Sequence, residues 1–158
     1  MIKILVCSDN HGLKQPLDIV RSYTDQVDFI VHCGDSEMMP SDLADMICVR
    51  GNHEFYQGFD RYRILDDLDG HKILITHGTG MVYGDNNDEL VEYANSISCD
   101  IVFHGHSHIP NFEIKKGVTI INPGSLRYNR DGSKPSFVIV TIDKEKISVN
   151  RINVSVEN

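Results

Sequence analysis

Five stretches of the chain share one pattern, in which a short apolar run ends in polar side chains. The apolar parts are rich in β-branched residues, as in strands buried on both faces of a sheet. Every ending includes aspartate, asparagine or histidine. The stretches are KILVCSDNH (3–11), VDFIVHCGD (27–35), MICVRGNH (46–53), HKILITHG (71–78) and CDIVFHGHSH (99–108). The pattern therefore predicts five buried strands with polar ends.

Helix-like stretches lie between several of these predicted strands. Residues 13–23 place Leu17, Val20 and Arg21 at helical spacing, and residues 41–45 fit a short helical turn. Residues 86–97 carry acidic side chains early, as helix N-termini prefer. Strand–helix–strand alternation predicts a mainly parallel sheet with right-handed crossovers. Because ligands of such sheets gather at the carboxyl ends of the strands, the polar endings are expected to meet there.

In the last third of the chain, the pattern predicts antiparallel pairs of strands instead. Residues 111–125 fit a hairpin with Lys116 and Gly117 at its turn, and residues 136–154 fit two strands about Asp143 and Lys144. Residues 127–136 form a predicted polar loop, because they are rich in residue types that favour turns. These strands would extend the first sheet or form a second one. Because no repeat, low-complexity tract or linker interrupts residues 1–158, one domain is expected.

Composition and charge narrow the class of partner. No apolar run approaches the length of a membrane span, so no membrane partner is expected. The formal net charge of −8 disfavours long nucleic acid. The chain leads directly into its first predicted strand without a leader pattern, which predicts a cytoplasmic protein. The cysteines form no CxxC pair and are expected to be buried and reduced: Cys7, Cys33, Cys48 and Cys99.

The residue types at the strand ends suit a metal site. Aspartate, asparagine and histidine suit Mn, Fe, Co, Ni or Zn better than a thiolate-type site would. In an extended chain, residues two apart turn to the same side, as at positions 9 and 11 and at positions 106 and 108. The candidates are too many for one tetrahedral zinc ion and suit two metals that share a carboxylate. They are Asp9, His11, Asp35, Asn52, His77, His106 and His108.

A shared carboxylate has an electrostatic reason. Two divalent ions about 3.5–4 Å apart repel each other by roughly 5 kcal/mol even in water, and a bridging anion offsets this repulsion. Asp35 is the expected bridge because it ends a central predicted strand and is the only acid in HCGD. Two metals would lower the pKa of bound water and hold both ends of an in-line displacement at phosphorus.

In their order along the chain, the motifs DNH, GD, GNH, HG and GHSH resemble the signature of the calcineurin-like metallophosphoesterases. The small size and the NPGS at 122–125 resemble the compact phosphodiesterase branch of that family, which includes a retromer subunit of the same fold. The resemblance implies an α/β fold, a four-layer αββα sandwich of two mixed β-sheets flanked by helices. It also implies a metal-dependent phosphoesterase, more a phosphodiesterase than a monoesterase, in which a hydroxide bridging two metals attacks in line.

Matched residue by residue, the resemblance divides the ligands between two divalent ions. One ion would be held by Asp9, His11, Asp35 and His108. The other would be held by Asp35, Asn52, His77 and His106. His53 matches the family's non-ligand histidine and would serve as general acid or transition-state donor near the leaving-group oxygen. Manganese is the first expectation for the metal, with Ni, Fe, Zn and Co as alternatives.

Two positions depart from the family pattern. Glu54 follows GNH, where the family often has an aspartate that orients the histidine, so the support of His53 is expected to be altered. Thr79 stands where many relatives have a second histidine that is not a ligand. The metals should therefore be retained, while substrate contact or product release would differ.

Several residues outside the motifs have a structural and a functional interpretation. His104 is expected to pack in the core or to donate a hydrogen bond to a metal ligand or a backbone carbonyl. Arg50 and Arg127 are expected in surface ion pairs, with a phosphate contact as the alternative. Tyr83 occupies the third glycine position of a G-x-G-x-x-G-like stretch, which argues against a dinucleotide cofactor there.

Two function classes follow. The first is a phosphoesterase that acts on a small phosphoester or nucleotide-type substrate. The second is a non-catalytic, metal-binding scaffold for protein partners, because fold alone does not fix function. The intact ligand set and His53 argue against the scaffold, and the acidic charge argues against a nuclease for long nucleic acid. The sequence leaves the physiological substrate, the resident metal and a homo-oligomer open.

Overall fold

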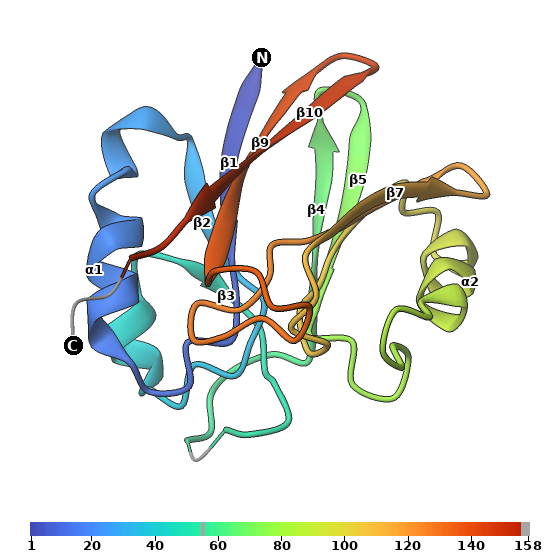
Figure 1. Cartoon of the computed structure of the whole chain (residues 1–158). Helices are drawn as coiled ribbons and strands as arrows, with labels where there is room; N and C mark the ends of the chain where they lie inside the picture. The colour runs from blue at the N-terminus through green and yellow to red at the C-terminus, as the bar shows by residue number, and fades with distance from the viewer. Residues whose placement is uncertain (55, 156–158) are drawn as a thin grey trace.

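Two five-stranded β-sheets pack face to face, and one α-helix covers the outer face of each sheet (Figure 1). The computed structural model describes residues 1–54 and 56–155. In Figure 1 the four layers follow one another from α1 (Lys14–Arg21) to α2 (Asp88–Ser96). The expected αββα sandwich of two mixed sheets is therefore confirmed. No helix in the described ranges is long and apolar enough to cross a membrane.

The first sheet has the strand order β10-β9-β1-β2-β3. Its parallel part consists of β1 (Ile2–Cys7), β2 (Phe29–His32) and β3 (Ile47–Cys48). The hairpin of β9 (Ser136–Asp143) and β10 (Lys146–Asn153) adds two antiparallel strands beside β1. Short 3₁₀ helices occupy Thr24–Gln26 and Pro40–Leu43, the second of them at the predicted helical turn.

The second sheet has the strand order β4-β5-β6-β8-β7. Its parallel centre consists of β5 (His71–Thr76), β6 (Ile101–Phe103) and β8 (Val118–Asn122). Antiparallel strands form both edges, β4 (Tyr62–Leu68) beside β5 and β7 (Asn111–Lys115) beside β8. The predicted hairpins about residues 116–117 and 143–144 are confirmed, and each extends a different sheet.

Strands buried on both faces explain the continuous apolar runs. Along β1, Ile4 and Val6 face the core between the sheets, while Leu5 and Cys7 pack against Leu17 and other residues beneath α1. The second sheet alternates in the same way, with one set of side chains facing α2. Each fully buried Ile, Leu or Val contributes about 1.5–3 kcal/mol to folding. The four cysteines belong to these buried layers and are unpaired, as expected.

The strands end earlier than the sequence pattern predicts. β1 ends at Cys7 and β6 at Phe103, and the polar residues after them form loops. Their backbone explains the difference, because Asp9 has a φ of 58° and His106 a φ of 71°, which lie outside the β region of regular strands. β4 was not predicted, because this edge strand is largely exposed and carries two aspartates in place of an apolar run.

Candidate metal centre

The loops that leave β1, β2 and β6 hold an unusual number of side chains in the left-handed backbone region. Five predicted ligands have positive φ: Asp9 (58°), His11 (45°), Asp35 (58°), His106 (71°) and His108 (57°). This conformation costs a residue other than glycine roughly 1–2 kcal/mol. Such residues persist where the surrounding structure fixes them, and they cluster at functional sites. The backbone thus turns these side chains toward one region.

Glycines in two motifs allow the loops to approach each other. A Cβ atom at Gly51 would overlap the carboxylate and backbone of Asp35. A Cβ atom at Gly105 would overlap the Ser8 hydroxyl and lie 2.5 Å from Asp9 Oδ2. Neither glycine has positive φ, so close approach is the reason for both. Gly51 thus brings together two loops of the first sheet, and Gly105 brings the loop after β6 of the second sheet against the loop after β1.

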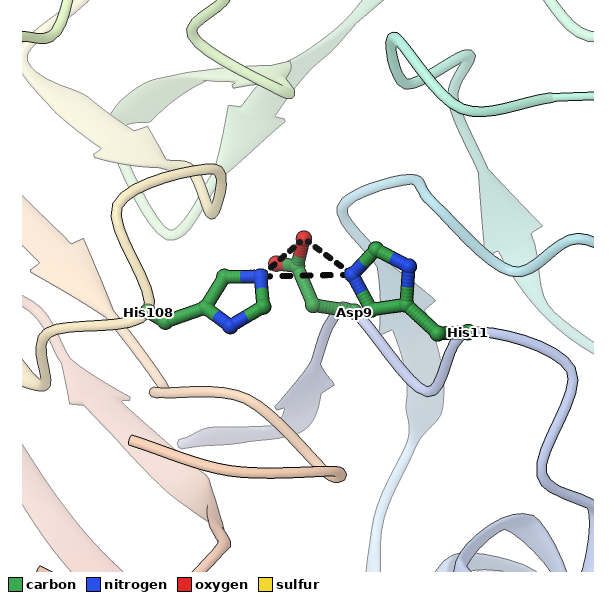
Figure 2. Close-up of side chains that lie close together, drawn as sticks. All are labelled: Asp9, His11 and His108. Carbon is green, nitrogen blue, oxygen red and sulfur yellow. Dashed lines mark hydrogen bonds and ion pairs between the residues drawn. The ribbon is translucent and has the colours of Figure 1, made fainter. Parts of the chain in front are cut away.

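One group of ligand atoms joins Asp9, His11 and His108 (Figure 2). His11 Nε2 lies 3.2 Å from His108 Nε2, and His108 Nε2 lies 3.3 Å from Asp9 Oδ1. The third distance, from His11 Nε2 to Asp9 Oδ1, is 3.7 Å. Figure 2 shows the three side chains pointing toward one another from two different loops. Three ligand atoms so close together can all contact one ion.

A second group joins Asp9, Asp35 and His77. His77 Nε2 lies 3.2 Å from Asp35 Oδ2 and 3.8 Å from Asp9 Oδ1. Asn52 Oδ1 extends this group, at 3.0 Å from His77 Nε2 and 3.3 Å from His106 Nδ1. The structure therefore brings all seven predicted ligands together. It also places Asp9 in both groups, a central position that the sequence pattern did not indicate.

Backbone carbonyls orient two of the histidines. The Nδ1 atom of His77 lies 2.8 Å from the carbonyl of Cys33, and that of His108 lies 3.2 Å from the carbonyl of Tyr128. A ring that donates from Nδ1 keeps a lone pair on Nε2, and in both residues Nε2 faces the ligand groups. In its neutral form, each ring is thus held in the tautomer that can bind a metal through Nε2.

The two central carboxylates are buried and ionised. Burial raises the pKa of Asp9, but the nearby His108 and the charge of His77 outweigh it and bring this pKa below its usual value. The pKa of Asp35 is also lowered, because contacts with His77 and the backbone N–H of His53 outweigh burial. Both carboxylates are therefore ionised at neutral pH, which is the form that binds a metal ion.

One buried oxygen has no hydrogen-bond partner in the described part of the chain, namely Asp9 Oδ1. Leaving a buried acceptor unpaired costs about 1–3 kcal/mol, and more when it is charged. A divalent ion beside this oxygen would satisfy it, and the surrounding oxygen and imidazole donors suit such an ion. The residues present therefore fit a bound metal.

His53 lies beside the ligand groups and is exposed. Its ring centroid is 5.8 Å from that of His11, and its backbone N–H donates to Asp35 Oδ1 at 2.7 Å. The carboxylate of Glu54 accepts hydrogen bonds from the N–H groups of Ser36 (3.1 Å) and Glu37 (3.2 Å). Glu54 thus holds the loop after β2, and it makes no hydrogen bond to the His53 ring.

A cleft of about 340 Å³ exposes this centre to solvent. Its walls include Arg127, Tyr128 and Arg130, beside Glu37, His53 and five of the seven predicted ligands. Lysine and arginine ion pairs within the described ranges involve Arg21 and Lys115, so the ion pairs predicted for Arg50 and Arg127 are not found among these residues. Both arginines line cavities instead. Sequence reasoning missed Arg130, which lies in a polar loop without a motif.

His104 lies apart from the ligand groups. It is 2% exposed, and its Nδ1 lies 3.1 Å from the carbonyl of Gly105. Burial lowers the pKa of His104 to about 4, so the ring is neutral and donates from Nδ1. The expectation of a packed histidine bonded to a backbone carbonyl is confirmed. Thr79 lines a second cavity, together with Asn52 and His77.

Residues 2–145 match the family model of the calcineurin-like phosphoesterase superfamily domain. The chain belongs to this superfamily. This calcineurin-like phosphoesterase is 34% identical over 153 residues to the probable metallophosphoesterase YsnB of Bacillus subtilis. That match covers 94% of this chain and 89% of the relative. The family expected from the motifs is therefore confirmed.

Solved structures show the same fold. A predicted phosphoesterase from Streptococcus pneumoniae matches with a TM-score of 0.86 and 28% identity, over 96% of this chain and 89% of that one. Vps29 from Entamoeba histolytica, in its complex with zinc, matches with a TM-score of 0.73 over 96% of this chain and 98% of that one. At 20% identity, the second match shows the shared fold alone.

Proposed function

We propose that this calcineurin-like phosphoesterase is a metal-dependent phosphodiesterase with a dinuclear centre, acting on a small phosphoester or nucleotide-type substrate in the cytoplasm. One observation carries the proposal. Two groups of ligand atoms share the buried, unpartnered Asp9 Oδ1, and His53 lies beside them in the same cleft. Asp35 can also contribute to the first group, Asp9, His11 and His108, because its Oδ2 lies 3.9 Å from His11 Nε2. Four buried, unpaired cysteines support a reducing compartment.

Each proposed ion has its own set of residues. Asp9, His11, Asp35 and His108 would hold one ion, and Asp35, Asn52, His77 and His106 would hold the other, with manganese as the first candidate. When bound, such ions lower the pKa of water and offset the charge of a phosphate. The shared carboxylates reduce the repulsion between two divalent charges.

The remaining polar groups of the cleft act on the substrate. The His53 ring is exposed, so its N–H can donate a proton to a leaving-group oxygen. Arg127 and Arg130 lie on the cleft wall without carboxylate partners in the described ranges, and their guanidinium groups can pair with phosphate oxygens. A non-catalytic scaffold has no use for an exposed histidine at this position.

Charge supports a diester over a monoester. A monoester carries about −1.5 to −2 at pH 7, whereas a diester lacks the second ionisation and carries a single negative charge. The chain has a formal net charge of −8, and the Glu37 carboxylate lines the cleft. A monoester would therefore meet more repulsion on approach.

The test compares two chromogenic substrates. Metal-free protein is supplied with Mn²⁺ and assayed with bis-p-nitrophenyl phosphate and p-nitrophenyl phosphate. We expect release that depends on metal, that is faster with the diester, and that saturates at two ions per chain by metal analysis. If no metal stimulates release from either compound or from natural nucleotides, the proposal fails.

His53→Ala separates catalysis from metal binding. We expect this variant to keep two ions per chain and to lose turnover by about 10²–10⁴-fold, the usual contribution of an acid–base group. Turnover is measured with bis-p-nitrophenyl phosphate and metal content by atomic absorption. His71→Gln, a histidine change away from the cleft, should retain full turnover. Loss of bound metal from His53→Ala would contradict the role of His53 as a proton donor.

A further inference from the structure

A second cavity adjoins the metal centre on the side of β4 and α2. Its volume is about 530 Å³, within the usual range of small-ligand sites. Arg50, Arg61, Tyr62 and Tyr93 are among the residues that line it, and we call it the Arg61–Tyr62 cavity. Asn52 lines both this cavity and the metal cleft. A molecule that reacts in the cleft can therefore extend past Asn52 into the cavity.

The charges of the cavity favour an anion. Arg50 and Arg61 are exposed, and neither takes part in an ion pair within residues 1–54 and 56–155. The acid on the same wall, Glu54, is occupied by backbone N–H groups of the loop after β2. Two guanidinium groups without partners in an acidic protein suit phosphate oxygens, which they bind in a bidentate manner.

The aromatic side chains favour a planar ring. Tyr62, the first residue of β4, is 49% exposed. Its ring meets that of Tyr93, on α2, edge to face with centroids 6.5 Å apart. Tyr93 thus supports Tyr62 from the side, and the exposed ring of Tyr62 offers a surface on which a base can stack. Aromatic and cationic groups together are the combination that binds nucleotides.

We infer that the Arg61–Tyr62 cavity binds a nucleotide arm of the substrate, with the base on Tyr62 and an additional phosphate at Arg50 and Arg61. This inference rests on the proposed function and names its substrate class. The substrate is a nucleotide-type compound in which a base-bearing, phosphorylated arm is attached to the phosphate that reacts in the metal cleft.

Binding of AMP to the metal-free protein tests the inference without turnover. Titration calorimetry compares AMP with adenosine and with inorganic phosphate. We expect AMP to bind more tightly than either fragment, because only AMP offers both the base and the phosphate. Arg61→Ala and Tyr62→Ala should each weaken AMP binding about tenfold, since a charge-assisted contact contributes about 1.5–3 kcal/mol and a stacked base about 1–3 kcal/mol, and about 1.4 kcal/mol corresponds to a factor of ten.

Arg63→Ala is the matched control, because Arg63 is also exposed and lies on β4 but does not line the cavity. It should bind AMP like the wild type, and thermal melting checks that every variant is folded. Absence of AMP binding, or equal binding by wild type, Arg61→Ala and Tyr62→Ala, overturns the inference. So does a loss in Arg127→Ala without a loss in Arg61→Ala, because the nucleotide then occupies the metal cleft.

The two proposals fail in different experiments. If AMP binds as expected and no phosphoester is hydrolysed with any metal, the phosphodiesterase proposal fails and the cavity still binds nucleotides. If bis-p-nitrophenyl phosphate is hydrolysed and AMP does not bind, the cavity has no nucleotide arm to hold and only the inference about it is overturned.

Discussion

Asp9 is the residue on which both ligand groups depend, and all of its polar atoms except Oδ1 have hydrogen-bond partners. Its N–H donates to the carbonyl of Gly34 at 3.0 Å, and its carbonyl accepts from the Ser125 hydroxyl at 2.8 Å. Oδ2 accepts from the N–H of His106 at 3.2 Å and from the Ser8 hydroxyl at 2.5 Å. Oδ1 alone is left for an ion. The serine of NPGS therefore helps to hold the backbone of Asp9.

Asp9→Asn should weaken both the metal-free protein and its binding of metal, for two separate reasons. Without metal, the change removes the attraction to His77 and His108 that lowers the pKa of Asp9 below its usual value, so we expect a lower melting temperature. With metal, the change removes an anionic donor, so the affinity for Mn²⁺ should fall more than the 10–100-fold known for outer-shell residues. Calorimetric titration and thermal melting measure the two effects. Asp25→Asn, on an exposed aspartate, should change neither, and an unchanged Mn²⁺ affinity in Asp9→Asn would contradict the central place of Asp9.

At the residue scale, the sequence predicts which residues are candidate metal ligands better than it predicts the contacts that orient them. Each candidate ligand follows an apolar run, and a polar residue at such a position is easily recognised in the sequence. The contacts of His77 with the Cys33 carbonyl and of His108 with the Tyr128 carbonyl were not predictable, because every residue has a carbonyl group. The ion pairs predicted for Arg50 and Arg127, which are not found among the described residues, have a similar cause, since the position of a surface side chain depends on distant loops.

At the scale of elements, the loop after β6 must pass directly over the loop after β1. Gly105 lies at the contact, where a Cβ atom would overlap Ser8 and approach Asp9 Oδ2. The N–H of Gly105 also donates to the carbonyl of His77, at 3.1 Å. One residue without a side chain therefore connects three of the loops that carry the candidate ligands.

Gly105→Ala should disturb the metal centre as well as the fold. The new methyl group must displace Ser8 and Asp9, which costs about 1–3 kcal/mol as overpacking does elsewhere. We expect a lower melting temperature together with weaker Mn²⁺ binding. Gly117→Ala is the control, because Gly117 has a φ of 79° and open space around it. That change should cost roughly 1 kcal/mol through backbone strain and leave Mn²⁺ binding intact, and normal Mn²⁺ binding in Gly105→Ala would contradict this interpretation.

The elements were predictable to the extent that they are buried. Strands β1, β2, β5 and β6 are buried on both faces and produce apolar runs, and α1 and α2 have apolar faces over the sheets. β4 is an edge strand with mostly exposed side chains, and its beginning at Tyr62 was not predicted. Its pairing with β5 is fixed by the turn at Asp69 and Gly70, a signal that was present in the sequence.

At the scale of the whole molecule, the two sheets are joined at the end opposite the candidate metal centre. β5 begins at His71 and ends next to His77, so His71 marks the opposite end. Here the turn between β4 and β5 meets the turn between β9 and β10 (Figure 1). The N–H of Lys144 donates to Asp69 Oδ2 at 2.6 Å. His71 lies between the turns, with Nε2 at 2.5 Å from the Lys144 carbonyl and Nδ1 at 2.6 Å from Asp100 Oδ2.

This junction makes the stability of the sandwich depend on the charge of His71. Burial lowers the pKa of His71, but the Lys144 carbonyl and the Asp100 carboxylate outweigh it, so the pKa is raised above the ordinary value of 6.5. Only the protonated ring donates from both nitrogens, and folding therefore favours it. Because the folded pKa is the higher one, the stabilisation is complete below about pH 6.5 and is lost as the pH rises through the folded value.

His71→Gln measures this contribution. At pH 5.5 the variant should have a free energy of unfolding lower than the wild type by about 1 kcal/mol, the usual net value of a hydrogen bond. The difference should shrink as the pH rises toward 9, because the neutral wild-type ring keeps only one donor. Urea denaturation of both metal-free proteins across this range gives the difference and cancels the titration of every other group. A difference that does not change with pH would show that His71 joins the two sheets by packing alone.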